Sequence, residues 1–149
     1  MMLYNPKKIS LEEAQASGVD VNFELMENGE KRYRLVSSDG SGYCRTEGSG
    51  AGAWQNSHYH KSTSEFYLVQ SGWIVYAELN ESGEGEFRIL REGESVLVTP
   101  LVHHNIYMSA DSVIHTIKYG GGAEDTVDWF ASEELDTFIQ LHKEDGKYF

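Results

Sequence analysis

From residue 31 to residue 119, short runs rich in Tyr, Val, Ile, Phe and Trp alternate with clusters of Gly, Ser, Asn and Asp. Runs of about four to eight β-branched and aromatic residues, separated by turn-forming residues, are typical of strands in a sandwich or barrel. The sequence therefore predicts an all-β fold with eight or nine strands. The expected strands span residues 31–36, 43–46, 54–60, 65–70, 73–79, 86–90, 95–99, 105–108 and 112–119.

A short helix is expected on each side of this β region. Ser10 and Glu13 form a capping-box pattern, which satisfies free amide groups at the start of a helix. We expect that helix over residues 11–17, and a second helix over residues 133–143, where apolar residues recur at helical spacing. The chain of 149 residues has the length of one domain, 1–149, with a barrel core of about residues 31–119.

The charge of the chain excludes two classes of partner. The formal net charge of -12 repels nucleic-acid phosphates and anionic membrane surfaces, so we expect neither as a partner. No apolar run approaches the roughly 20 residues that span a bilayer, and no leader-like segment opens the sequence. The single cysteine, Cys44, has no partner for an internal disulfide. We therefore expect a cytoplasmic protein.

Five residues are candidate metal ligands. His58 and His60 lie two positions apart in one expected strand, so their side chains point to the same face. Glu65 follows after a short polar stretch that can turn the chain into the next strand, and His103 and His104 come later. Three imidazoles and one carboxylate suit one divalent ion of Fe, Mn, Zn, Ni or Co. Four protein ligands leave an octahedral ion two positions for water or substrate.

Two segments resemble the sequence motifs of the cupin superfamily. Gly52-x5-His58-x-His60-x4-Glu65-x6-Gly72 matches the first motif at every fixed position, and residues 93–104 look like the second motif. The resemblance covers about residues 45–119 and implies a cupin-type jelly-roll β-barrel. It also implies a metal ion held by His58, His60, Glu65 and His104.

The second motif departs from the family pattern at several positions. Leu101 stands where the family usually has Gly, and Met108 replaces the Asn usually found four residues after the ligand histidine. Counting from Pro100 assigns the ligand position to His104, with His103 as the alternative metal ligand. Adjacent strand residues face opposite ways, so only one of these two histidines can point inward.

Strand alternation also indicates which side chains surround the metal. Trp54 and Asn56 share a face with the two ligand histidines, and Tyr67 shares a face with Glu65. Candidate acid–base residues are Tyr67 and His115, although His115 also fits a core histidine bonded to a neighbouring hydroxyl. The candidate substrate-binding residues are Trp54, Asn56, Tyr76 and Met108. Arg45 and Lys118 are candidates for gripping an anionic substrate, with a surface role as the alternative for each.

Several functions are compatible with such a site. The hypothesis that we rank first is that the protein is a metal-dependent isomerase or epimerase of a sugar or sugar phosphate. In such an enzyme the metal polarises a carbonyl or hydroxyl group. An iron-dependent dioxygenase and a non-catalytic module that binds or senses a small molecule are the alternatives. Family habit and apolar strand edges also predict a homodimer.

Overall fold

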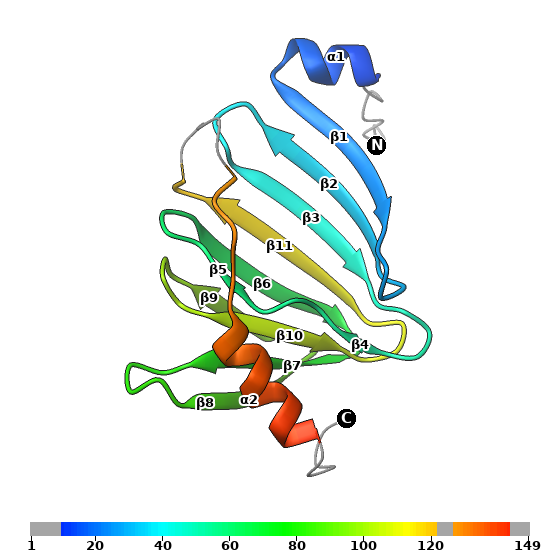
Figure 1. Cartoon of the computed structure of the whole chain (residues 1–149). Helices are drawn as coiled ribbons and strands as arrows, with labels where there is room; N and C mark the ends of the chain where they lie inside the picture. The colour runs from blue at the N-terminus through cyan, green and yellow to red at the C-terminus, as the bar shows by residue number, and fades with distance from the viewer. Residues whose placement is uncertain (1–9, 122–126, 144–149) are drawn as a thin grey trace.

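The computed structural model describes residues 10–121 and 127–143. Its strands form two six-stranded sheets that face each other (Figure 1). The first sheet has the order β1 (Val19–Leu25), β2 (Lys31–Ser37), β3 (Gly42–Glu47), β11 (Val113–Tyr119), β6 (Ser64–Ser71) and β9 (Ser95–Val98). The second has the order β12 (Phe130–Ala131), β5 (His58–Tyr59), β10 (His104–Met108), β7 (Trp73–Leu79) and β8 (Gly85–Arg91), with β4 (Ala53–Trp54) paired to β10. The all-β jelly-roll prediction is confirmed, although the sheets do not close into a hydrogen-bonded barrel.

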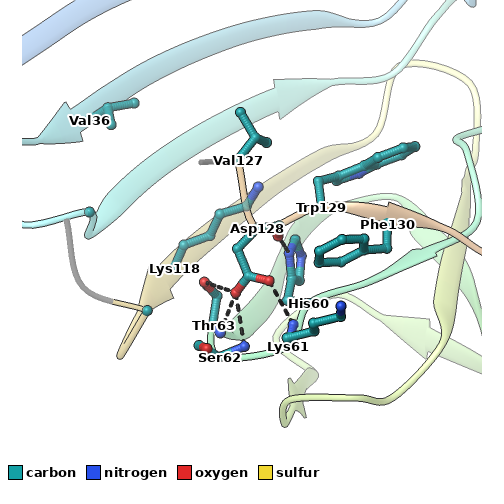
Figure 2. A pocket seen from close by; sticks show the side chains of 12 residues that line it. Val36, His60, Lys61, Ser62, Thr63, Lys118, Val127, Asp128, Trp129 and Phe130 are labelled. Atoms are coloured by element: carbon teal, nitrogen blue, oxygen red, sulfur yellow. Dashed lines mark hydrogen bonds between the residues drawn. The ribbon is translucent and has the colours of Figure 1, made fainter. Parts of the chain in front are cut away.

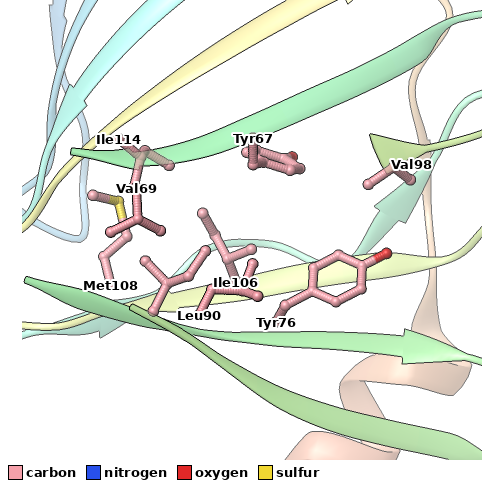
Figure 3. Close-up of a cluster of buried hydrophobic side chains, with 9 residues drawn as sticks. Tyr67, Val69, Tyr76, Leu90, Val98, Ile106, Met108 and Ile114 are labelled. Carbon is pink, nitrogen blue, oxygen red and sulfur yellow. The ribbon is translucent and has the colours of Figure 1, made fainter. Parts of the chain in front are cut away.

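The main core fills one end of the space between the two sheets (Figure 3). Ile74 on β7, Ile106 on β10 and Ile114 on β11 are almost completely buried there. Alternate residues of a strand face the same side, so every second side chain of these strands enters the core. The remaining members are Tyr67, Val69, Tyr76, Leu90, Val98 and Met108.

Two helices flank the sheets, as the sequence predicts. Helix α1 (Leu11–Ala16) precedes β1, and the Ser10 hydroxyl accepts a hydrogen bond from the Glu13 amide at 3.1 Å. Helix α2 (Glu133–Lys143) lies against the outer side of the second sheet, where Leu135 packs near Ala77. Neither described helix is long and apolar enough to span a membrane.

The expected strand 54–60 is interrupted. Residues 55–57 separate β4 from β5, and the side-chain amide of Asn105 bridges the gap by donating to the Gln55 carbonyl and the Ser57 hydroxyl, both at 3.0 Å. The break ends the simple alternation along the segment. Trp54 therefore packs on the outer side of the second sheet, in ring contact with Phe87, instead of facing the metal ligands.

The β region is longer than the predicted core of residues 31–119. Strand β1 comes before it and pairs with β2 along its full length, and β12 comes after it and pairs with β5. The apolar residues of β1 alternate with polar ones, but they face outward. The strict alternation over residues 19–25 is a strand signal that the prediction from the sequence did not use. Strand β12 has only two residues, too few for any periodic pattern.

Leu101, which stands where the cupin pattern usually has glycine, adopts a backbone conformation that glycine favours. Its backbone is left-handed, with φ of 71°, a conformation that glycine adopts without steric cost. This conformation directs the Leu101 amide to the carbonyl of His60 at 2.6 Å, which fixes the loop before β10 against the ligand segment. Leucine thus occupies a position whose geometry suits the glycine usual in the family.

Replacing Leu101 with glycine should therefore stabilise the protein. The leucine side chain is 63% exposed, so little packing is lost, and relief of the left-handed strain outweighs the added freedom of the unfolded chain. We expect Leu101→Gly to raise the free energy of unfolding by about 0.5–1 kcal/mol in urea titrations. The matched control is Leu141→Gly, equally exposed at 64% but inside α2, which should lower stability by about 1 kcal/mol. Equal destabilisation by both substitutions would contradict the strain argument.

Candidate metal centre

Four buried side chains meet where the two sheets approach each other. His58 on β5, His60 just after it, Glu65 on β6 and His104 on β10 each offer one ligand atom, and these atoms all lie within 4.8 Å of one another. The register explains the meeting, because His104 is the direct cross-strand partner of His58. Glu65 comes from the opposite sheet.

Backbone carbonyls orient all three imidazoles in the same way. The Nδ1 atom of His58 bonds the Asn56 carbonyl at 2.9 Å, and that of His104 bonds the Val102 carbonyl at 2.9 Å. The Nδ1 atom of His60 bonds the carbonyl of Asp128. A carbonyl accepts only, so each Nδ1 carries the proton and each Nε2 keeps a lone pair for a metal ion.

The Nε2 atoms and the Glu65 carboxylate of the cluster are arranged as in a metal site. The Nε2 atoms of His58 and His104 lie 3.3 Å from one carboxylate oxygen of Glu65, and the Nε2 of His60 contacts the same oxygen. The Nε2 of His104 is buried without a hydrogen-bond partner among the described residues. Lone pairs gathered around one buried carboxylate, one of them unsatisfied, fit a divalent cation.

Electrostatics favour the metal-binding protonation states of Glu65 and His58. Burial alone would raise the pKa of Glu65, but its contacts with the three imidazoles, first His104, and the charge of Lys118 hold this pKa far below its usual range. Burial lowers the pKa of His58, which favours the neutral imidazole. The Glu65 carboxylate is therefore charged at neutral pH, and the His58 imidazole is neutral and can bind a metal ion.

Tyr67 holds the second oxygen of the Glu65 carboxylate. Its hydroxyl donates to Oε2 of Glu65 at 2.6 Å, from a side chain that is buried. Burial, together with the negative charge of Glu65, raises the pKa of Tyr67 well above its usual value. Tyr67 therefore remains a hydrogen-bond donor, and it positions the ligand carboxylate.

A segment near the end of the described chain completes the site. Besides the carbonyl that accepts from His60, Asp128 uses its carboxylate to accept hydrogen bonds from the amides of Lys61, Ser62 and Thr63 at 2.7–2.9 Å (Figure 2). The Thr63 hydroxyl donates as well, at 3.0 Å. Trp129 stacks on His58, with ring centroids 5.4 Å apart. This segment therefore holds the turn that joins the ligands His60 and Glu65.

A cavity of about 740 Å³ opens beside the cluster (Figure 2). His60 lies in its wall, so the cavity meets the cluster at this residue. Trp129 and Phe130 supply aromatic surface, and Lys118 supplies a positive charge. The cavity has the size range of sites for small metabolites.

The structure brings only part of the predicted site together. Tyr67 contacts Glu65, and Lys118 lines the cavity. Tyr76 faces the space between the sheets, but its hydroxyl donates to Glu78 at 2.6 Å. Met108 lies fully buried in the hydrophobic core. Asn56 contributes its backbone carbonyl to His58, while its side chain is exposed.

Three other candidates lie away from the cluster. His115 is on the outer face of the first sheet, where it bonds the Tyr43 hydroxyl at 2.7 Å and the Gln70 amide oxygen at 2.6 Å. Strand alternation correctly placed His115 on the same face of β11 as Val113 and Ile117, but this face is the outer face of the sheet. Arg45 is also on that face, paired with Glu47 at 2.5 Å. His103 bonds the Ser132 hydroxyl at 2.6 Å and stacks on Tyr59.

Sequence reasoning missed three residues around the site. Asp128 and Trp129 lie far along the chain from the motifs, in a stretch without a recognisable pattern. Glu78 had a usable signal, because it follows Tyr76 by two positions on a predicted strand and so shares its inward face. It pairs across strands with His104 and lies 3.6 Å from the Arg88 guanidinium.

The hydrogen bonds that the Asp128 carboxylate accepts make its contribution to the stability of the fold dependent on pH. Burial alone would raise its pKa, but hydrogen bonds from Lys61, Ser62 and Thr63 outweigh this effect and lower it to about 2. A depressed pKa stabilises the fold above the unfolded value of about 3.9, and this stabilisation disappears as the pH falls toward 2. Asp128→Asn should therefore reduce the free energy of unfolding by about 1 kcal/mol at pH 7.

Urea titrations of the wild-type protein and Asp128→Asn between pH 7 and pH 2.5 test this prediction. The stability difference between the two proteins should stay constant down to about pH 5 and then shrink. A difference that does not vary with pH would mean that the carboxylate charge does not hold the turn.

Comparison with known proteins supports the fold. No protein-family model matches the sequence, and no curated protein matches it. Among solved structures, oxalate decarboxylase from Bacillus subtilis aligns with a TM-score of 0.63 and 13% identity, over 98% of this chain and 38% of that chain. KdgF from Halomonas sp. aligns with a TM-score of 0.55 and 17% identity, over 69% of this chain and 86% of that chain.

A third similar structure is a domain of CENP-C from Drosophila melanogaster, with a TM-score of 0.57 and 18% identity, over 76% of this chain and 86% of that chain. At these identities the likeness concerns the fold. The two facing sheets and the buried cluster of three histidines and one glutamate agree with the two sequence motifs. This chain has the cupin fold.

Proposed function

We propose that this protein is a metal-dependent enzyme acting on a small, oxygen-rich metabolite, and that isomerisation or epimerisation of a sugar or sugar phosphate is its reaction. The observation that carries the proposal is a cluster of four buried candidate ligands beside a metabolite-sized cavity, with one of them, His60, in the cavity wall. A metal that served only to stabilise the fold would not need such an opening.

The ligand set suits one ion of Fe, Mn, Co, Ni or Zn, which when bound supplies Lewis-acid chemistry to a carbonyl or hydroxyl group. The chain's own residues prepare the site for it. Tyr67 fixes the Glu65 carboxylate, and Asp128 fixes both His60 and the turn after it. Trp129 covers His58 from the cavity side. Cys44, the only cysteine, is a free thiol, which supports a cytoplasmic location.

Two alternatives have specific support. An iron-dependent dioxygenase would use the same ligand set with substrate and oxygen at the remaining positions of the ion. A non-catalytic binding module is the second, because one structure similar to this chain is CENP-C bound to CAL1, whereas another is the enzyme oxalate decarboxylase. The fold alone therefore does not distinguish catalysis from binding.

The test begins with metal content, measured by plasma mass spectrometry on protein purified without chelator or nickel resin. We expect close to one ion per chain in the wild-type protein and in His103→Gln, and at least a tenfold lower occupancy in His104→Gln. The two variants change neighbouring histidines, of which only His104 belongs to the cluster. Equal metal loss in both variants would contradict the assignment.

The reaction is then assayed with the metal-replete protein in deuterated water under nitrogen, using a panel of sugars, sugar phosphates and sugar acids. Isomerisation or epimerisation by proton transfer should place solvent deuterium in the substrate, which NMR detects, and His104→Gln should abolish this exchange. Turnover that appears only with oxygen would favour the dioxygenase. Saturable binding without any product would favour the binding module.

A further inference from the structure

We propose that Lys118 anchors the carboxylate of a small 2-hydroxy or 2-oxo acid in the cavity beside the metal ligands. The inference rests on the proposed function. It narrows the substrate from any small, oxygen-rich metabolite to one that carries a carboxylate. Lys118 lies on β11, directly opposite Glu65 on one side and Gly42 on the other. Directly paired residues of antiparallel strands share a face, so Lys118 points inward with Glu65, and Gly42 places no side chain beside it.

Lys118 acts electrostatically on the carboxylate of Glu65, its cross-strand partner, but it forms no ion pair among the described residues. Within residues 10–121 and 127–143, no carboxylate lies at ion-pair distance from its ammonium group. The carboxylate of Asp128 lines the same cavity, but the amides of Lys61, Ser62 and Thr63 already bind it. A cation that faces a cavity without an ion-pair partner is suited to an anionic ligand.

The wider charge balance favours an anion as well. Three neutral imidazoles and one carboxylate leave a divalent ion with a net positive charge, and Lys118 adds another beside it. The chain as a whole carries a net charge of -12. Lys61 and Lys118 outnumber the single carboxylate of Asp128 in the cavity lining, so with a bound ion the cavity is a positive site on an acidic protein and attracts small anions.

The amide groups around the cavity favour a carboxylate over a phosphate. Phosphate sites usually gather several backbone amides or arginines. Here the three consecutive amides that would form such a nest are occupied by Asp128. Lys61, the other cavity lysine, holds its ammonium over the Phe130 ring at 4.2 Å. One available ammonium fits one carboxylate, and a neighbouring hydroxyl or carbonyl oxygen of the ligand can then reach the metal.

The cobalt-loaded protein provides the test, because its visible absorption reports changes in coordination. We would titrate it with glycolate and with glycolamide, its neutral analogue, and with inorganic phosphate as a third probe. Glycolate should bind wild-type protein more tightly than glycolamide or phosphate. In Lys118→Met the affinity for glycolate should fall at least about tenfold, while that for glycolamide stays unchanged. Lys118→Arg should retain most of the glycolate affinity.

Lys61→Met is the matched control, because it removes a positive charge from the same cavity and should change glycolate affinity by less than about twofold. Metal content and glycolamide binding show that each variant is folded. Unchanged glycolate binding in Lys118→Met, or an equal loss in Lys61→Met, would overturn the inference and leave the proposed function standing. Stoichiometric cobalt whose spectrum responds to no probe would also overturn the inference, whereas the deuterium-exchange assay tests the proposed function independently.

Discussion

The bond from each ligand histidine to a backbone carbonyl is the interaction on which the site depends. The acceptors are the carbonyls of Asn56, Asp128 and Val102, so the main chain fixes every ring before a metal arrives. The site then needs only small movements to bind an ion, which favours affinity because little conformational freedom is lost. Tyr67 does the same for the carboxylate of Glu65. The site is therefore preorganised by the fold and by one buried hydroxyl.

The site also joins the two halves of the fold. Glu65 belongs to the first sheet, while His58 and His104 belong to the second, and the sheets do not close by hydrogen bonding. At one end, apolar side chains such as Ile106 and Ile114 hold the sheets together. At the other end, the ligands take that place. A bound ion would therefore act as a cross-link between the sheets, and its binding energy would add to stability.

Local pattern predicted most strands and both helices, because burial and turn residues impose regular periods on the chain. The resemblance to the cupin motifs selected the four residues that cluster in the structure. The interruption at residues 55–57 was not predictable, since no Gly or Pro marks it and Asn105, far along the chain, repairs it. The role of Asp128 was equally hidden, because it depends on contacts more than 60 residues away in sequence. His115 shows that alternation sorts residues into two faces without saying which face is buried.

The distance along the chain between His60 and its carbonyl acceptor has a consequence for biosynthesis. That acceptor comes 68 residues later, and the segment that contains it is held by the pairing of β12 with β5 and by α2. A nascent chain that has emerged only as far as β11 already holds all four ligands, but His60 and the turn beyond it lack their restraint. Long-range contacts of this kind form late in folding. The full restraint of this cluster is consequently reached only after the last helix has docked.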